Sequence, residues 1–307
     1  MKKKIFVALS TFAEHGPEPL EILKKSGFSY VLNPLKRRVV RDEIIQWGKE
    51  AQGIIAGVEP YTADVFKSLP KLRCISRCGV GVDNIDLEKA KVLRIKVFNT
   101  PDEVIQPVVE LTIGFIFDLL RNISFHTQLL RSKKWEKKSG RLLAGRKIGI
   151  LGLGRIGRRV AEVLSKLDAD VYGSDIKPDR SWAKRYRVRI LPTDKLIESV
   201  DVLSIHTSAI EGHPFHLGKT EIAKMKPGSF IVNVARGQLL EEEVLYRALK
   251  NGHLAGAAMD VYPVEPYCGK LCELPNVVMT PHLATLTDES RLQMEIKATK
   301  NLINFLR

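Results

Sequence analysis

The sequence has few cysteines. Four occur among 307 residues: Cys74, Cys78, Cys268 and Cys272. Such a low density does not suggest a disulfide scaffold. Both pairs have C-x3-C spacing, whereas structural zinc sites usually use C-x2-C. We therefore expect free thiols and no metal site.

The sequence also lacks a long hydrophobic run. No apolar stretch approaches the roughly 20 residues that a membrane span needs. The lysines at 2–4 and the apolar residues 5–9 look like a signal peptide only superficially, because the apolar stretch is short and no small-residue cleavage site follows. A buried first strand explains them better, so we expect a cytoplasmic protein without a membrane partner.

Acidic residues are in deficit, with 35 Asp and Glu against 49 Lys and Arg and a formal net charge of +14. This balance is typical of proteins with anionic partners, such as nucleotides, phosphorylated acids or nucleic acid. The basic residues are spread along the chain, however, and the densest groups, 36–38 and 131–138, lack the interleaved aromatics of a nucleic-acid module. We expect a solvated basic surface and a small anionic substrate, with no nucleic-acid partner.

Short apolar runs alternate with helical patterns almost throughout. The chain is long enough for two domains, and this alternation predicts an α/β fold with parallel sheets covered on both faces. Strands are expected at residues 4–9, 30–32, 53–56, 73–76 and 96–98, then at 147–151, 169–173, 188–191, 201–205, 229–234, 255–259 and 277–280. Helices are expected at 19–25, 41–49, 103–121 and 288–307. The pattern predicts two doubly wound units.

A glycine-rich turn lies between a short apolar strand and an amphipathic helix. Gly152, Gly154 and Gly157 match the pattern G-x-G-x-x-G. They would permit a tight turn, the approach of a pyrophosphate to the backbone, and close packing of helix on strand, in that order. The helix N-terminus would hold the phosphates. Asp175, after the next strand, would accept a ribose 2′-hydroxyl and repel a 2′-phosphate, so the pattern predicts NAD as cofactor.

Three later segments follow predicted strands and supply the residue types that hydride transfer between NAD and a hydroxy acid requires. A cation must hold the substrate carboxylate and polarise the carbonyl. An acid/base must move the hydroxyl proton, which suits histidine, and a carboxylate beside it would orient the ring. Arg236, Glu265 and His282 supply these types. In open α/β sheets, ligands bind at the carboxyl ends of the strands, where all three residues lie.

Several further stretches match one family in its order. They are Arg-Cys-Gly-Val-Gly-Val-Asp-Asn-Ile-Asp at 77–86, Asn-Thr-Pro at 99–101, Val-Glu-Leu-Thr at 109–112 and Met-Lys-Pro-Gly at 225–228. With the segments above, they resemble the NAD-dependent D-isomer-specific 2-hydroxyacid dehydrogenases, most closely the phosphoglycerate dehydrogenase-like branch. The resemblance implies a flavodoxin-like substrate domain at 1–99 and 284–307, a Rossmann NAD-binding domain at 100–283, and a homodimer.

The resemblance also implies catalytic roles. Arg236 would bind the carboxylate and the carbonyl oxygen, His282 would donate the proton in the reducing direction, and Glu265 would be its partner. Each has a plainer alternative, as a surface arginine, a loop cap and a loop histidine. The three together, in this order after three strand ends, favour the functional interpretation.

The resemblance implies binding roles at other positions. Arg77 and the backbone N–H groups of Val80 and Gly81 would hold the substrate, and Asp260 would bind the nicotinamide carboxamide. Further cofactor contacts would come from Thr112, Arg155, Ile156, His206, Thr207, Val234 and Ala235. The remaining histidines, His15, His126, His213, His216 and His253, are expected on the surface or in loops.

One departure from the family pattern concerns the substrate. The branch commonly has Arg-Ser after its third strand to hold a substrate phosphate, but here the stretch 56–60 carries Glu59 and no arginine. Two substrate hypotheses stay open: oxidation of D-3-phosphoglycerate, slightly favoured, and reduction of an unphosphorylated 2-keto acid such as glyoxylate or hydroxypyruvate. A hypothesis of another class is an NAD(H)-sensing, corepressor-like binding protein.

Overall fold

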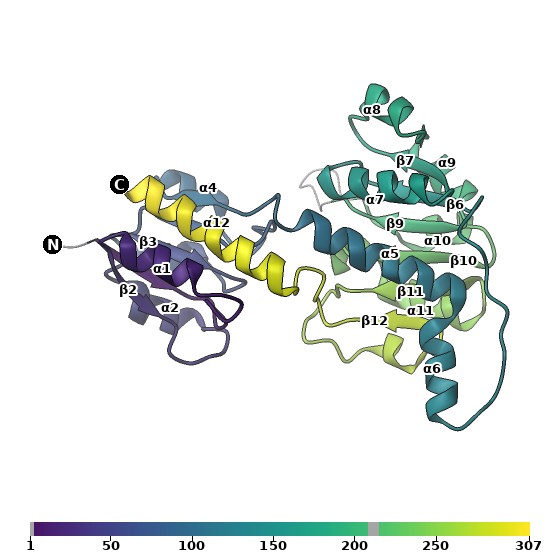
Figure 1. Ribbon diagram of the computed structural model, residues 1–307, viewed down its shortest axis with the longest axis horizontal. Coiled ribbons are helices and arrows are strands. Elements are labelled where there is room, and N and C mark those ends of the chain that lie inside the picture. The colour runs from purple at the N-terminus through teal and green to yellow at the C-terminus, as the bar shows by residue number, and fades with distance from the viewer. Residues whose placement is uncertain (1–2, 208–214) are drawn as a thin grey trace. The chain divides into compact units, whose positions relative to one another are not determined.

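The computed structural model describes residues 3–207 and 215–307 (Figure 1). The chain divides into two compact units. One comprises Met1–Val104 with Thr285–Arg307, and the other Ile105–Ala284. Among the described residues, no helix combines the length and the apolar character needed to cross a bilayer.

The first unit is built on a five-stranded parallel sheet with the order β2-β1-β3-β4-β5. Its strands are β1 (Lys4–Val7), β2 (Ser29–Leu32), β3 (Gly53–Ala56), β4 (Cys74–Arg77) and β5 (Lys96–Phe98). Its helices are α1 (Glu18–Lys25), α2 (Arg41–Gly48), α3 (Ala63–Lys67), α4 (Leu87–Val92) and α12 (Asp288–Leu306). The C-terminal helix α12 packs on β3 and β4, and a Cβ at Gly53 would lie only 2.9 Å from side-chain atoms of α12.

The second unit is built on a seven-stranded parallel sheet with the order β12-β11-β10-β9-β6-β7-β8. Its strands are β6 (Lys147–Leu151), β7 (Asp170–Ser174), β8 (Arg189–Ile190), β9 (Val202–Ile205), β10 (Ser229–Asn233), β11 (Leu254–Met259) and β12 (Val277–Met279). Its helices are α5 (Ile105–Arg121), α6 (Ile123–Arg131), α7 (Arg155–Lys166), α8 (Arg180–Arg185), α9 (Thr193–Ser199), α10 (Lys219–Lys224) and α11 (Glu242–Lys250), with 3-10 turns η1 (Gly237–Leu239) and η2 (Lys270–Glu273).

Helices cover both faces of the larger sheet. Apolar side chains of α5 and α7, such as Phe115 and Leu164, belong to one buried cluster. Side chains of α9 and α11, such as Ile197 and Leu245, belong to a second cluster. The prediction of two doubly wound parallel-sheet domains is therefore confirmed.

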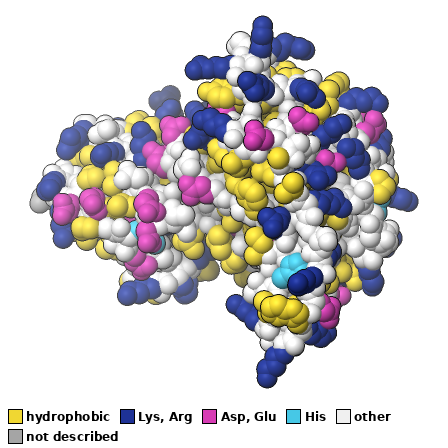
Figure 2. Space-filling model, turned by 45° about the vertical axis from the view of Figure 1, so that its right-hand side comes forward, with side chains coloured by type: hydrophobic (Ala, Val, Ile, Leu, Met, Phe, Trp, Pro, Cys, Tyr) yellow, Lys and Arg dark blue, Asp and Glu magenta, His cyan; other side chains and the backbone are white. Residues whose placement is uncertain are grey.

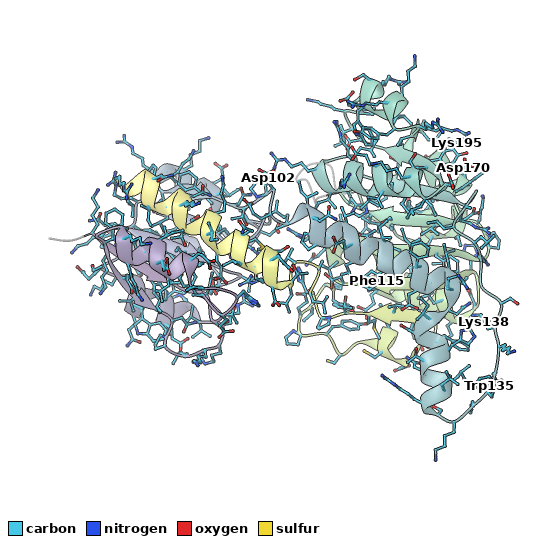
Figure 3. All side chains as sticks on the ribbon, in the orientation of Figure 1. Asp102, Phe115, Trp135, Lys138, Asp170 and Lys195 are labelled. Carbon is cyan, nitrogen blue, oxygen red and sulfur yellow. The ribbon has the colours of Figure 1, made fainter. Side chains whose placement is uncertain are left out.

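The helix α6 and the segment after it were not expected from the sequence. Asn122 adopts a left-handed conformation with φ of 54° between α5 and α6, and α6 has no buried residue. The following residues 132–141 form no regular structure, and Trp135 is 82% exposed (Figure 3). Figure 2 shows Lys and Arg side chains spread over the visible face, without one dominant basic patch.

Candidate active site

The glycine-rich turn joins β6 to α7. Gly152 has φ of +93°, which favours glycine, and a Cβ there would lie 2.7 Å from the Thr207 backbone nitrogen. A Cβ at Gly157 would lie 1.9 Å from the Gly152 carbonyl oxygen. Gly154, by contrast, has nothing within 4 Å of a would-be Cβ. Packing thus requires two of the glycines, while the third leaves open space at the start of α7.

The Asp175 side chain is hydrogen-bonded to this turn. One of its carboxylate oxygens accepts the Leu153 N–H at 2.7 Å and the other accepts the Lys177 N–H at 2.9 Å. The acid is therefore fixed beside the glycine turn, at the end of β7. Arg155 and Ile156 form the first turn of α7, exposed and half-buried respectively.

The other predicted cofactor residues fall on neighbouring strand ends and on α5. His206 and Thr207 follow β9, and Val234 and Ala235 follow β10. In the sheet, β10 lies beside β9, and β9 lies beside β6, the strand that leads into the glycine turn. Thr112 is buried in α5, where its hydroxyl donates to the Val108 carbonyl at 2.7 Å.

His206 is held in a neutral state. Its Nε2 lies 2.8 Å from the Ser204 hydroxyl, and burial lowers the pKa of the ring to about 3. A ring with so low a pKa is uncharged at neutral pH, so it has no imidazolium proton to transfer. Its backbone N–H donates to the Leu151 carbonyl at 2.7 Å, which holds the end of β9 against that of β6.

Arg236 is presented by a tightly held turn after β10. The buried Asn233 side chain accepts the Ala235 N–H at 3.1 Å and donates to the Arg236 carbonyl at 2.9 Å. The Arg236 guanidinium donates to the Ala235 carbonyl at 2.7 Å. A Cβ at Gly237 would lie 2.0 Å from the Tyr262 carbonyl carbon, so this turn and the turn after β11 are in close contact.

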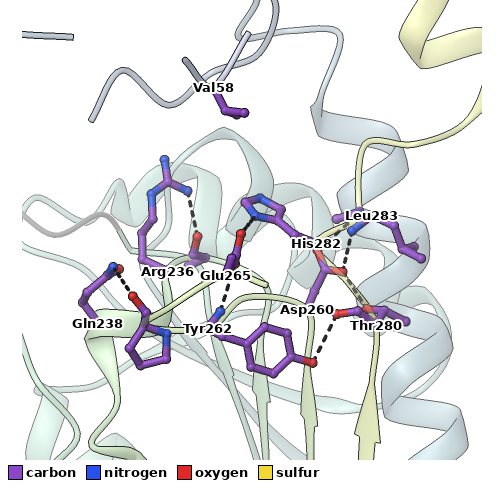
Figure 4. Close-up of polar contacts among 12 residues, drawn as sticks. Val58, Arg236, Gln238, Asp260, Tyr262, Glu265, Thr280, His282 and Leu283 are labelled. Carbon is purple, nitrogen blue, oxygen red and sulfur yellow. Dashed lines mark hydrogen bonds and ion pairs between the residues drawn. The ribbon is translucent and has the colours of Figure 1, made fainter. Parts of the chain in front are cut away.

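Glu265 and His282 form a direct pair (Figure 4). The His282 Nδ1 lies 2.8 Å from one Glu265 oxygen, and the other oxygen accepts the Tyr262 N–H at 3.1 Å. His282 has φ of 51°, a left-handed conformation that is uncommon for a residue with a Cβ. Bonds from Asp260 and Tyr262 hold the chain on either side of it.

Asp260 is fully buried and holds the turn that carries His282. Its carboxylate accepts the Thr280 hydroxyl at 2.6 Å and the backbone N–H groups of Leu283 and Ala284 at 2.8 and 3.1 Å. The Tyr262 hydroxyl adds a second link, because it lies 3.0 Å from the Met259 carbonyl and 3.2 Å from the Thr280 carbonyl. Asn233, Tyr262 and Thr280 were not predicted from the sequence, because each acts by holding a turn in place and none matches a catalytic or binding pattern.

The predicted substrate residues of the first unit lie at the end of β4. Gly79 has φ of +137°, and the Arg77 guanidinium, which donates to the Cys78 carbonyl, folds back over it. The Thr100 hydroxyl accepts the Gly79 N–H at 2.7 Å, and the Asn99 side chain donates to the Val80 carbonyl at 2.9 Å. Val80 is exposed and Gly81 half-buried. The loop is thus anchored on both sides of its exposed apex.

The cysteines are free, as expected. Burial raises the pKa of Cys74 and of Cys78 to about 12, while Cys268 and Cys272 are exposed. Within residues 3–207 and 215–307, no group of three or more His, Cys, Asp or Glu side chains is arranged to hold a metal ion.

Three of the histidines without a predicted role contact residues of neighbouring segments. His15 lies 2.9 Å from Asp288, His126 accepts the Lys138 N–H at 3.0 Å, and His253 lies 2.9 Å from the Ile222 carbonyl. His213 lies outside the described residues.

Comparison with known proteins identifies the family. Residues 113–284 match the model of the D-isomer specific 2-hydroxyacid dehydrogenase, NAD binding domain. A hydroxypyruvate reductase from Thermotoga maritima is 35% identical, with 97% of this chain and 99% of the relative covered. A D-3-phosphoglycerate dehydrogenase from Pongo abelii is 37% identical, with 88% and 51% covered. The chain thus spans about half the length of such curated relatives.

A solved structure has the same fold. The glyoxylate reductase from Paecilomyes thermophila superposes with a TM-score of 0.87 at 25% identity, covering 98% of this chain and 94% of that one. The range matched by the family model includes the glycine turn and the three loops that carry Arg236, Glu265 and His282. The chain belongs to the D-isomer specific 2-hydroxyacid dehydrogenase family.

Proposed function

We propose that this protein is an NAD-dependent dehydrogenase that interconverts a D-2-hydroxy acid and its 2-keto acid. The observation that carries the proposal is the His282–Glu265 pair, 2.8 Å apart, at the carboxyl ends of strands that neighbour the strand before Arg236. An imidazole oriented by a carboxylate, with a guanidinium at a neighbouring strand end, is the set of groups that this reaction requires.

His282 acts as the base when a hydroxy acid is oxidised and as the acid when a keto acid is reduced. Glu265 contacts Nδ1, which leaves Nε2 as the nitrogen that exchanges a proton with the substrate oxygen. Arg236 binds the substrate carboxylate with paired N–H donors and polarises the adjacent carbonyl. NAD, when bound, accepts the hydride and NADH donates it.

The glycine turn fits a dinucleotide. The open space at Gly154 gives phosphate oxygens access to the N-terminus of α7, where Arg155 and Ile156 lie. Asp175 is held where a ribose hydroxyl would meet it and where a 2′-phosphate would be repelled. We assign Thr112, His206, Thr207, Val234 and Ala235 to the walls of this site. Asp260, whose carboxylate already accepts three donors, contributes mainly by holding the 280–284 turn.

We further propose that the first unit is the substrate domain and the second the NAD-binding domain. In the first unit, the backbone N–H groups of Val80 and Gly81 and the Arg77 guanidinium bind the substrate. We place the protein in the cytoplasm, in keeping with its four free thiols.

A homodimer is the expected assembly. Its support is α6, which buries none of its residues, together with the exposed Ile123, Leu130 and Trp135. Sedimentation equilibrium of the wild type and of Trp135→Ala tests this. A monomeric wild type would contradict it, and a dimer weakened by the substitution supports it.

Two sets of observations support different substrates. The branch resemblance and the basic charge support D-3-phosphoglycerate, and curated relatives include D-3-phosphoglycerate dehydrogenases. Glu59, in place of an arginine, supports a small unphosphorylated keto acid, and the relative from Thermotoga maritima is named a hydroxypyruvate reductase. We favour the phosphorylated acid and keep the hydroxypyruvate type as the second candidate.

The test is to follow NADH oxidation with phosphohydroxypyruvate and with hydroxypyruvate at equal concentration. His282→Ala is measured beside the wild type, with NADH affinity read from the quenching of protein fluorescence. We expect turnover in the wild type, and loss of turnover with retained NADH affinity in the variant. Unchanged turnover in His282→Ala, or none with any 2-keto acid in the wild type, would refute the proposal.

A further inference from the structure

The loop after β3, residues 57–62, lies where the first sheet reverses its strand order. In the order β2-β1-β3-β4-β5, the strand after β1 lies on one side of it, and the chain then crosses to the other side for β3, β4 and β5. The order therefore reverses between β1 and β3. Ligands of open α/β sheets bind outside the carboxyl ends of the strands at this point of reversal. The loop also includes most of the stretch 56–60, which carries Glu59 and, unlike the family branch, no arginine.

Glu59 does not present its charge to this position. It is only 3% exposed, and its carboxylate accepts the Gly57 N–H of its own loop at 2.7 Å. The Asn84 side chain donates to the carbonyls of Glu59 and Gly57 at 2.6 and 3.2 Å. Burial raises the pKa of Glu59, and the nearby Arg38 and Arg77 oppose that rise. The acid therefore acts as an internal brace of the loop.

Arg38 reaches the same loop from the connection between β2 and α2. Its guanidinium donates to the Val58 carbonyl. A guanidinium has five N–H donors in a planar fork, so a bond to one carbonyl does not saturate it. The connection itself is well anchored, because the buried Asn33 side chain donates to the Arg37 carbonyl at 2.8 Å and to the Ala8 carbonyl at 3.0 Å.

The neighbouring Arg37 is engaged differently. Its guanidinium makes two bonds to Glu43, at 2.6 and 3.0 Å, and donates to the Arg38 carbonyl at 2.9 Å. The two adjacent arginines thus have the same charge and both are exposed, but among the hydrogen bonds of the described residues Arg38, and not Arg37, reaches the loop after β3. Arg37 is therefore a matched control for Arg38.

We infer that Arg38, from the connection after β2, supplies the phosphate-binding cation that the loop after β3 lacks, and that it forms with Arg77 a subsite for the phosphate monoester end of the substrate. The inference rests on the proposed function and specifies its substrate class. Arg38 is bonded to Val58 of this anchored loop, and Arg77 acts electrostatically on Glu59 of the same loop. Planar guanidiniums suit bidentate recognition of phosphate oxygens.

The experiment compares wild type, Arg38→Ala and Arg37→Ala. The quantity measured is the ratio of kcat/KM for phosphohydroxypyruvate to kcat/KM for hydroxypyruvate. Loss of a charge-assisted contact to phosphate should lower this ratio about tenfold or more in Arg38→Ala, mainly through KM of the phosphorylated acid. Arg37→Ala should leave the ratio unchanged. An unchanged ratio in Arg38→Ala, or an equal fall in Arg37→Ala, overturns the inference.

A binding measurement separates this inference from the proposed function. D-3-phosphoglycerate, D-glycerate and inorganic phosphate are titrated calorimetrically into the NAD-saturated proteins. If no keto acid is turned over, the proposed function fails, and the titrations still test Arg38. Tighter binding of D-3-phosphoglycerate than of D-glycerate, lost only in Arg38→Ala, supports the subsite. Equal affinities of the wild type for the two acids would overturn it, and so would an affinity for inorganic phosphate equal to that for D-3-phosphoglycerate.

Discussion

Replacing Glu265 by Gln is the sharpest test of how the site uses charge. The substitution keeps the shape of the side chain and a carbonyl oxygen that can accept the Tyr262 N–H, now 3.1 Å from the carboxylate. It removes the negative charge 2.8 Å from the His282 Nδ1. The imidazole becomes cationic when it takes the hydroxyl proton, so the carboxylate stabilises this state and the amide does not.

The size of the effect follows from the distance and the exposure. Two unit charges 2.8 Å apart attract by about 6 kcal/mol at an effective dielectric constant near 20, and by about 1.5 kcal/mol in water. The side chains of His282 and Glu265 are 49% and 37% exposed, which places the pair nearer the water limit. A loss of about 1.5–3 kcal/mol corresponds to a fall in kcat of roughly 10- to 200-fold.

The assay is steady-state kinetics in both directions, with the NADH dissociation constant measured separately. We expect kcat to fall within that range while the NADH affinity and the melting temperature change little. Glu273→Gln, an exposed acid of the same segment, is the control and should leave kcat unaltered. A Glu265→Gln enzyme with wild-type kcat would refute the electrostatic argument. A loss far above the range, with a lowered melting temperature, would show that the acid acts through the structure of the loop.

Three further predictions concern the frame of the site. Burial lowers the pKa of His206 to about 3 from 6.5, so the stability it contributes is present above pH 6.5 and is lost as the pH falls. Lowering the pH from about 7 to about 5 should reduce the free energy of unfolding, measured with urea, by about 1–2 kcal/mol more in the wild type than in His206→Gln. Equal losses in the two proteins would contradict this. A methyl at Gly157 would collide with the Gly152 carbonyl, so Gly157→Ala should lower unfolding stability by about 1–3 kcal/mol and weaken NADH binding. Gly154→Ala has space for its methyl, so it should weaken NADH binding without the loss of stability, and equal melting temperatures for the two variants would count against the packing argument. Tyr262→Phe keeps the ring but loses its hydroxyl bonds to two carbonyls, which should cost about 0.5–1.5 kcal/mol of stability and lower kcat more than it raises KM. A change confined to stability would limit Tyr262 to packing.

The positions of the chemical groups could be predicted from the sequence because parallel strands share a carboxyl edge. Once the strands before Arg236, Glu265 and His282 are recognised, the three side chains must emerge at that edge. The strands that precede them, β10, β11 and β12, are also neighbours in the sheet, so the three loops lie side by side. The glycine turn is predictable for a similar reason, since two of its glycines meet backbone atoms of their own loop or of the next strand end.

The contacts between those loops could not be predicted in the same way. The family resemblance implies a cofactor contact for Asp260, and the structure adds that its buried carboxylate accepts three donors of the 280–284 turn. Spacing along the chain contains no signal for such bonds, because they join a side chain to the main chain of a distant loop. The helix α6 does not contribute to the core that the apolar pattern predicts, because it has no buried residue: Ile123 and Leu130 are exposed, and Phe125 and Leu129 are half-buried.

Two carboxylates of the same segment therefore have opposite environments and opposite tasks. Asp260 is buried, and its carboxylate accepts three donors from the turn that carries His282, so removing it would take away bonds that hold this left-handed turn. Glu265 is partly exposed and contacts the ring that exchanges the proton. The first holds the turn that carries the imidazole, and the second contacts the imidazole directly. Substitutions at the two positions should accordingly separate, with Asp260 variants losing stability together with activity and Glu265 variants losing activity at nearly constant stability.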